Sequence, residues 1–78
     1  MNIEIITPDA TIFKGTAKLV QFPGIDGSFE VLNNHAAMIS VLKKGKIKVQ
    51  DENNQNQFFE VKGGVVEVLK NKILVLAE

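Results

Sequence analysis

The chain of 78 residues contains no cysteine and only one histidine, His35. Without cysteine no disulfide can form, and one histidine with no cysteine makes a structural zinc site untenable. A domain of this size rarely gains more than about 3–5 kcal/mol of net stability from its core, and it usually needs a disulfide, a metal or a partner. Composition therefore favours a partner protein as the remaining source of stability.

Arginine, tryptophan and tyrosine are also absent, and the nine lysines balance nine acidic residues. Nucleic-acid-binding proteins usually carry a basic patch with arginine or stacking aromatic residues, so this composition counts against that class. No apolar run approaches the roughly 20 residues that span a bilayer, and no basic segment followed by an apolar one opens the chain. We expect a soluble, unsecreted protein in a reducing compartment, with no cofactor.

Turn residues interrupt short, strand-like segments about every 8–12 residues, which is typical of a sandwich or barrel. Residues 46–50 alternate strictly between polar and apolar, as in a half-exposed strand, and no helical period is sustained anywhere. The polar run 51–57 is expected to be a hairpin loop. Strands are predicted at residues 2–6, 11–13, 16–22, 28–32, 38–42, 46–50, 59–62, 65–69 and 73–77. The fold class is therefore all-β: a single small antiparallel β-sandwich over residues 1–78, with two packed sheets and about eight to ten short strands.

Two of the predicted strands are apolar on both sides. Residues 73–76 have no polar position, and residues 65–69 have only Glu67. Such a strand is either central and covered by loops, or it offers its outer side to another protein. Both alternatives are open at this point.

A search for catalytic groups finds nothing that converges. Ser40, His35 and Asp26 could be written as a triad, but neither of the two serines lies in a nucleophile elbow. The glycine-rich segment 24–27 lacks the Gly-Lys-Ser/Thr ending of a phosphate-binding loop, so it is interpreted as a tight turn. His35 is interpreted as a turn residue whose imidazole bonds nearby backbone, with a pH-sensitive contact as the alternative. We predict a protein that is not an enzyme.

The segment Pro-Gly-Ile-Asp-Gly-Ser-Phe-Glu-Val-Leu-Asn-Asn-His-Ala-Ala-Met-Ile-Ser, residues 23–40, resembles a motif of the epsilon subunit of rotary F-type ATP synthases. The resemblance extends to Ile-Ile-Thr-Pro-Asp near the start, to Val-Lys-Gly-Gly-Val-Val-Glu-Val at 61–68, and to the closing Ile-Leu-Val-Leu-Ala-Glu. Four segments in the family's order are together specific. The chain departs from the family pattern at Glu30, Asn33 and Ala37, which loosens the expected backbone restrictions of the loop.

The resemblance implies the family's β-sandwich domain, without the pair of C-terminal helices that usually follows and carries the inhibitory function. It implies a non-catalytic central-stalk subunit that binds the gamma subunit, contacts the c-ring loops and couples rotation to ATP synthesis. It also implies a peripheral position at the cytoplasmic face of the bacterial inner membrane. The c-ring-facing residues would lie in a loop from Gly24 to His35. The candidates for the c-ring are Ser28, Glu30, Asn34 and His35, and those for gamma, on one side of strand 38–42, are Met38, Ser40 and Leu42.

Two other classes stay open: a small nucleic-acid-binding barrel, and a β-sandwich hydrolase that would use His35. An OB-like barrel that binds single-stranded nucleic acid would use exposed aromatics, and Phe58-Phe59 beside Lys62 is the one hint. Neighbouring strand residues point to opposite faces, so at most one of these rings could serve. A lipoyl or biotinyl carrier domain would need a lysine at a hairpin tip, and the surroundings of Lys72 do not match either attachment motif.

Overall fold

The computed structural model describes residues 1–78 and contains nine strands and no helix. The strands are β1 (Asn2–Ile6), β2 (Thr11–Thr16), β3 (Leu19–Gly24), β4 (Gly27–Leu32), β5 (Met38–Leu42), β6 (Gly45–Gln50), β7 (Asn56–Val61), β8 (Gly64–Leu69) and β9 (Lys72–Ala77). The all-β prediction is confirmed, and the predicted bounds of β1 and β5 coincide with the observed ones.

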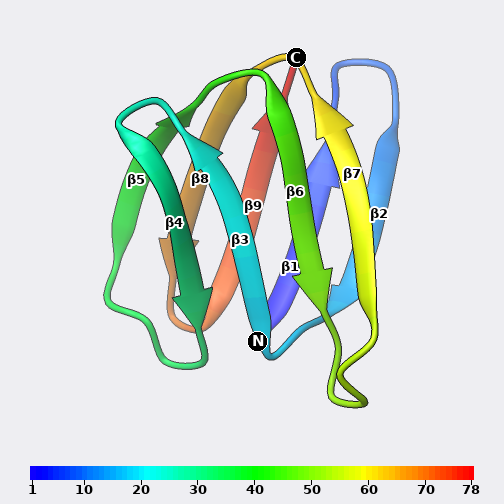
Figure 1. Cartoon of the computed structure of the whole chain (residues 1–78), viewed down its shortest axis with the longest axis vertical. Helices are drawn as coiled ribbons and strands as arrows, with labels where there is room; N and C mark the ends of the chain where they lie inside the picture. Colours follow the sequence, from blue (N-terminus) through cyan, green and yellow to red (C-terminus); the bar gives the residue numbers. More distant parts are fainter.

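The nine strands form one hydrogen-bonded sheet that folds over on itself into two layers (Figure 1). One layer holds β2-β1-β9-β8-β5 in that order, and the other holds β4-β3-β6-β7. The layers join through one pair of residues, Gly24 on β3 and Leu42 on β5. All pairs are antiparallel except β1 with β9, which run parallel. The predicted antiparallel sandwich is therefore confirmed with one parallel exception, at the centre of the five-stranded layer.

The core lies between the layers and consists of fifteen buried apolar residues. It is made of Ile3, Ile5, Ala17, Val20, Phe22, Val31, Leu42, Ile47, Val49, Val61, Val66, Val68, Ile73, Val75 and Ala77. No polar or charged residue is buried, so burial of the core leaves no charge to be compensated.

Two aromatic pairs support the sandwich, one within the four-stranded layer and one between the two layers. The rings of Phe22 and Phe29 stack on β3 and β4 with centroids 5.3 Å apart. The rings of Phe13 and Phe59 lie 4.9 Å apart and come from β2 and β7, the two ends of the sheet order. Aromatic pairs at such separations contribute about 0.5–1.5 kcal/mol beyond their burial. Phe13 and Phe59 therefore close the side of the sandwich where the sheet has no further hydrogen-bonded partner.

The turns use the residues that their backbone angles require. Lys70 and Asn71, which join β8 to β9, both have positive φ (50° and 61°), as a two-residue hairpin turn demands. The polar run after β6 forms the predicted hairpin loop, although its last two residues belong to β7. Asp51 Oδ1 accepts bonds from the backbone N–H of Asn53 (2.8 Å) and Gln55 (3.0 Å), which fixes the loop.

Several predicted strand bounds are wrong: the third strand begins at Leu19 instead of residue 16, and the seventh spans Asn56–Val61 instead of residues 59–62. Two further errors have a clear structural cause. The second strand was predicted to end at Phe13, but β2 continues through Gly15 to Thr16, and a Cβ at Gly15 would lie 3.0 Å from Phe13 Cζ. The glycine thus makes room for the aromatic ring and is not a turn. The third strand was predicted to end at Phe22, but β3 continues through Pro23 to Gly24. Pro23 is tolerated because the pairing with β6 stops at Gln21, so no hydrogen bond to β6 needs an N–H at residue 23.

Candidate functional site

The residues that could be written as a catalytic triad do not meet. Asp26 lies in the turn before β4, and His35 lies in the loop after it. The six residues of β4 span about 20 Å, and the two ends of the strand lie at opposite ends of the sandwich in Figure 1. Ser40 stands in the middle of β5. The arrangement therefore offers no nucleophile next to a base.

His35 behaves as the turn residue that the sequence predicts. Its imidazole Nδ1 lies 2.8 Å from the backbone oxygen of Ala36, and its backbone N–H donates to the backbone oxygen of Leu32 at 3.2 Å. No group of three or more histidine, cysteine, aspartate or glutamate side chains is placed to hold a metal ion. The structure contains no helix long and apolar enough to cross a membrane.

The outward side of the five-stranded layer is the main apolar surface of the molecule. It presents seven apolar side chains that are exposed or half-buried: Ile6, Ile39, Val41, Val65, Leu69, Leu74 and Leu76. We call these seven residues the apolar face. The most exposed is Ile39, with 72% of its surface accessible. The two strands with apolar residues on both sides, β8 and β9, are central in this layer and are not covered by loops.

The strand register lines up part of the apolar face into a continuous row. Val41 pairs with Val65, Val65 pairs with Leu76, and Leu76 pairs with Ile6. Side chains on directly paired residues lie about 4.5–5.5 Å apart, so the four form an apolar band across β5, β8, β9 and β1. A band of this kind on a small domain is typical of a protein-binding surface.

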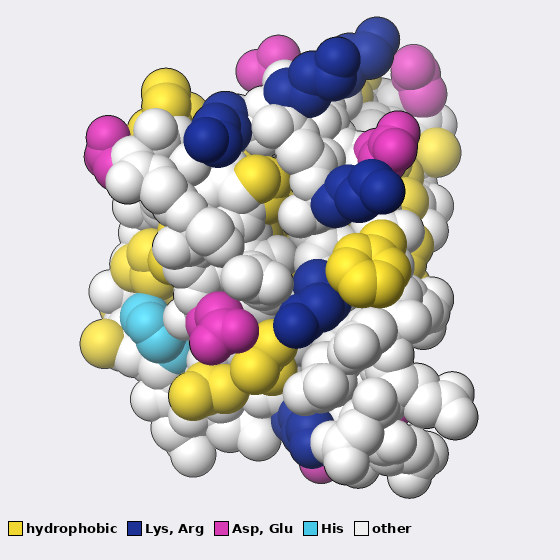
Figure 2. Space-filling model, viewed as in Figure 1, with side chains coloured by type: hydrophobic (Ala, Val, Ile, Leu, Met, Phe, Trp, Pro, Cys, Tyr) yellow, Lys and Arg dark blue, Asp and Glu magenta, His cyan; other side chains and the backbone are white.

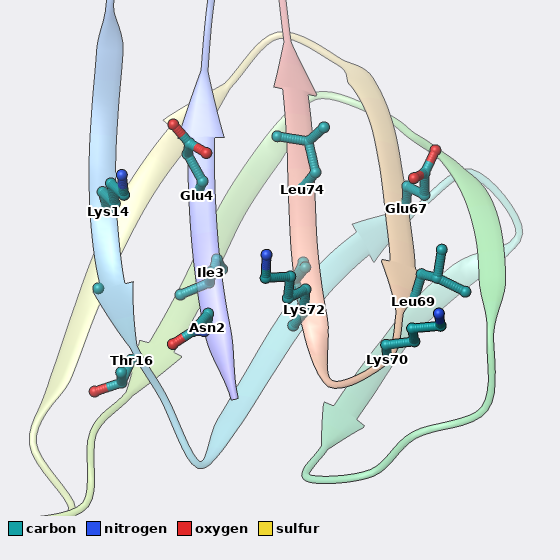
Figure 3. Close-up of a pocket in the computed structure, with 12 residues that line it drawn as sticks. Asn2, Ile3, Glu4, Lys14, Thr16, Glu67, Leu69, Lys70, Lys72 and Leu74 are labelled. Atoms are coloured by element: carbon teal, nitrogen blue, oxygen red, sulfur yellow. The ribbon is translucent and has the colours of Figure 1, made fainter.

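Charged residues flank the band on the same side of the layer, around a shallow depression of about 660 Å³ (Figure 3). Glu4 and Glu67 lie on either side of Leu74, because both residues pair with Leu74 from the two neighbouring strands. Lys14 lies opposite Glu4 on β2, and Lys70 and Lys72 border the lower end. The depression thus adds both signs of charge beside an apolar surface, which suits a specific protein partner better than a lipid or a single anion.

The gamma-facing candidates share one side of β5, as alternation requires, but the structure shows that this side faces inward. Leu42 is 3% exposed and belongs to the core, and Met38 packs against that core. Ser40 lies between them on the same inward side. The three candidates therefore lie on the core-facing side of β5, and the outward residues of β5 are Ile39 and Val41. The signal that could have found them is the neighbouring strand β8, whose residues 65–69 are apolar on both sides except for Glu67.

The c-ring-facing candidates do not share one loop. Ser28 and Glu30 lie on the outward side of β4, where Gln21 Nε2 donates to Ser28 Oγ at 3.1 Å. Asn34 and His35 lie in the loop after β4, at the other end of the sandwich. That loop is fixed to the β8–β9 turn, because the backbone N–H of Asn34 donates to Asn71 Oδ1 at 2.8 Å. The prediction of a single loop from Gly24 to His35 is wrong, because most of this segment is a strand.

The outward side of the four-stranded layer is different in character. Figure 2 shows this side, with basic side chains gathered over its upper half. Lys46 and Lys48 alternate with core residues on β6, and Phe58 on β7 is 59% exposed beside Lys48. Phe59 points inward onto Phe13. Only one aromatic ring is therefore exposed here, which is too little for a platform that stacks successive bases.

Comparisons with known proteins identify the family. Residues 1–78 match the family described as ATP synthase, Delta/Epsilon chain, beta-sandwich domain. The chain belongs to this family. Similar curated proteins named ATP synthase epsilon chain include one from Salinibacter ruber, 41% identical over 86 residues, and one from Alkalilimnicola ehrlichii, 35% identical over 78 residues. This chain is covered completely in both, but it spans 58% and 56% of those proteins. An epsilon chain from Chlorobium limicola is 34% identical over 77 residues, covering 99% of this chain and 88% of that protein.

Chains in two solved ATP synthase structures share the fold. A chain in the Euglena gracilis mitochondrial ATP synthase, solved with OSCP, F1 and the c-ring, matches 96% of this chain and 48% of its own length at a TM-score of 0.90 and 17% identity. A chain in the central stalk and c-ring of the Tetrahymena thermophila mitochondrial ATP synthase matches 97% of this chain and 61% of its own length, at a TM-score of 0.78 and 22% identity. Membership of this family agrees with the prediction of a non-catalytic ATP synthase subunit.

Proposed function

We propose that this epsilon-family chain is a non-catalytic subunit of the central stalk of an F-type ATP synthase. It binds the gamma subunit, contacts the loops of the c-ring and passes rotation between them as part of one rigid body. It is peripheral to the membrane, at the cytoplasmic face of a bacterial inner membrane. The proposal is supported by the curated relatives, which are epsilon chains.

The observation that carries the proposal is the apolar face. Burial of a Leu, Ile or Val side chain contributes about 1.5–3 kcal/mol when the side chain starts fully exposed. Five members of the apolar face are more than a third exposed: Ile39, Val41, Val65, Leu69 and Leu76. A partner that covered them would gain several kcal/mol, which is the kind of surface that a permanent complex needs. We assign this face to gamma, replacing the inward side of β5.

The second support is the density of the hydrogen-bonded framework. The chain has 47 backbone–backbone hydrogen bonds, of which 37 lie within the strands. A subunit that transmits rotation has to resist deformation, and a sheet in which six of the nine strands pair on both sides does so without any catalytic group. We retain the four c-ring candidates as two alternative contact sites. One is formed by Ser28 and Glu30 on β4, and the other by Asn34 and His35 in the loop after β4.

A matched pair of substitutions tests the gamma-binding face. Ile39→Lys introduces a charge on the apolar face, and Leu32→Lys introduces the same charge on the opposite layer, where Leu32 is 54% exposed. Both variants should keep the thermal midpoint of the isolated chain within about 2–4 °C, because exposed substitutions change stability by about 0.5 kcal/mol or less. The measurement is co-elution of each variant with a gamma-containing catalytic head.

We expect Ile39→Lys to lose most of the complex with gamma and Leu32→Lys to retain it. A desolvated, unpaired lysine in a protein interface costs several kcal/mol, so the loss should be at least about tenfold in affinity. Equal binding by both variants would show that gamma does not use the apolar face. Loss with Leu32→Lys alone would assign gamma to the four-stranded layer.

A further inference from the structure

The polar run 51–57 and the Phe58-Phe59 pair are not used by the proposed function, and both belong to β7 or the loop before it. β7 is the last strand of the sheet order and pairs only with β6. From the edge of β7 we infer that the free chain associates with a second copy of itself, through antiparallel pairing of β7 with β7 of that copy. This inference does not depend on the proposed function, because the apolar face lies on the other layer.

The register of the β6–β7 hairpin shows which backbone groups of β7 are free. Asp51 N–H donates to Gln55 O at 3.0 Å, so residues 51 and 55 form a hydrogen-bonded pair that closes the hairpin. Hydrogen-bonded pairs alternate along an antiparallel ladder, so Gln57 and Phe59 direct their backbone groups toward β6. The N–H and C=O groups of Asn56, Phe58 and Glu60 therefore point away from the sheet. None of the ten backbone hydrogen bonds outside the strands uses these groups.

From residue 53 to residue 59 the sequence around β7 lacks the features that usually protect a sheet edge, and Glu60 is the one charge on β7. Residues 53–59 contain no charge, no proline and no glycine. Proteins block exposed edges with charges, prolines or bulges, and uncharged segments rich in Asn, Gln and aromatic residues favour strand-to-strand association. The other free edges carry a charge nearer the middle of the strand. β2 carries Lys14 and a register shift in its pairing with β1, and β4 carries Glu30 near its centre.

The edge is also complementary to itself, which favours a second copy over an unrelated strand. A two-fold axis at Phe58 places Phe58 opposite Phe58 of the second copy, and Asn56 opposite the second copy's Glu60. The pairs at 56, 58 and 60 are the ones whose backbone groups are free, so each gains two hydrogen bonds. No like charges meet, and the Asn56 amide is placed to donate to the carboxylate of Glu60. The side chains of Asn56, Phe58 and Glu60 share the exposed outward side of the layer, so the pairing leaves the core intact.

The first test measures association of the free chain. Sedimentation velocity over roughly a hundredfold range of concentration should show an average mass that rises toward that of a dimer, as mass action requires. Over the same range, hydrogen exchange of the amides of Asn56, Phe58 and Glu60 should slow, while amides already bonded to β6 should not change. A mass that stays monomeric, with unchanged exchange at these three amides, would overturn the inference.

Two substitutions locate the contact. Phe58→Lys places two lysines opposite each other at the two-fold axis, so it should abolish the rise in mass, whereas Phe58→Thr keeps a neutral strand-forming residue and should leave at least part of it. Because the chain has no cysteine, Phe58→Cys gives a clean cross-linking probe, with Glu30→Cys on the other edge strand of the same layer as its control. Paired residues in such a ladder have Cα atoms about 5.5 Å apart, which suits a disulfide.

On oxidation we expect Phe58→Cys to form the cross-linked dimer at least about tenfold faster than Glu30→Cys. Similar rates for the two cysteines would refute pairing through β7. A dimer that persists in Phe58→Lys would also refute it, because that dimer would have to use another surface.

Discussion

The sidedness of β5 can be tested with two neighbouring residues whose substitutions should have opposite effects. Leu42 is 3% exposed and lies in the core, whereas Val41 is 49% exposed and belongs to the apolar face. Leu42→Ala deletes buried carbon atoms and leaves a cavity, which costs about 2–5 kcal/mol in other cores. Val41→Ala removes a side chain that is already half in water, so its effect on folding should be about 0.5 kcal/mol or less.

These values translate into large and small shifts of the thermal midpoint. One kcal/mol shifts the midpoint of a domain of this size by about 4–8 °C, so a loss of about 3 kcal/mol should lower it by about 12–24 °C in Leu42→Ala. Such a loss would remove most of the roughly 3–5 kcal/mol that a small core supplies. In Val41→Ala the shift should be about 2–4 °C, with weaker binding to gamma as the main effect.

The assay is thermal unfolding followed by circular dichroism, combined with co-elution with gamma below the unfolding range. If Val41→Ala unfolds as early as Leu42→Ala, the outward position of Val41 is wrong. If Leu42→Ala keeps its midpoint but loses gamma, then Leu42 contacts gamma and the inward assignment of that side of β5 is wrong.

Two further predictions concern the glycines and the c-ring. Gly64→Ala should prevent stable folding, because Gly64 has a φ of 145° and an added Cβ would lie 2.4 Å from Leu76 O. Gly27→Ala, with a φ of 125° and open space around it, should cost only about 1–3 kcal/mol of strain. Urea unfolding compares the two variants, and equal stabilities would contradict the close approach of Gly64 to Leu76. Ser28 lies near the start of β4 and Asn34 lies in the loop after its end, so about 13 Å of strand, from residue 28 to residue 32, separates the two positions. Of Ser28→Cys and Asn34→Cys, only one should therefore cross-link to a cysteine in a c-ring loop of the assembled enzyme. Efficient cross-linking by both would show that the c-ring does not contact one end of β4 in preference to the other.

Local patterns in the sequence predicted most of the strands correctly because alternation and turn residues act over a few residues. β1 and β5 have the predicted bounds, and the hairpin after Gln50 follows from the polar run. The errors at Gly15 and Pro23 arose from contacts that no local pattern reveals: the Phe13 ring above Gly15, and the end of the β3–β6 pairing before Pro23. Both residues are typical of turns, but here the tertiary context accommodates them inside strands.

The candidate site was predictable in kind but not in detail. Residues 73–76, apolar on both sides, left two alternatives open, and the structure leaves Leu74 half-buried and Leu76 exposed on the outward side of the layer. The sequence could not determine which side of β5 faces outward, because Met38 and Leu42 suit an interface as well as a core. The pairing of Val41 with Val65 resolves this, since it aligns β5 with a strand whose buried side is fixed by Val66 and Val68. A register between strands distant in the sequence is a property of the whole sheet.

The parallel pairing of β1 with β9 has a mechanical consequence. The first and last strands of the described chain lie side by side at the centre of a layer and are matched over five residue pairs, Asn2 with Lys72 through Ile6 with Leu76. Because they run in the same direction, tension between the start of β1 and the end of β9 loads all of these rungs in shear at once. An antiparallel hairpin pulled from its two open ends would instead separate one rung at a time. A force transmitted along the chain would therefore meet its strongest resistance at the seam between the two ends.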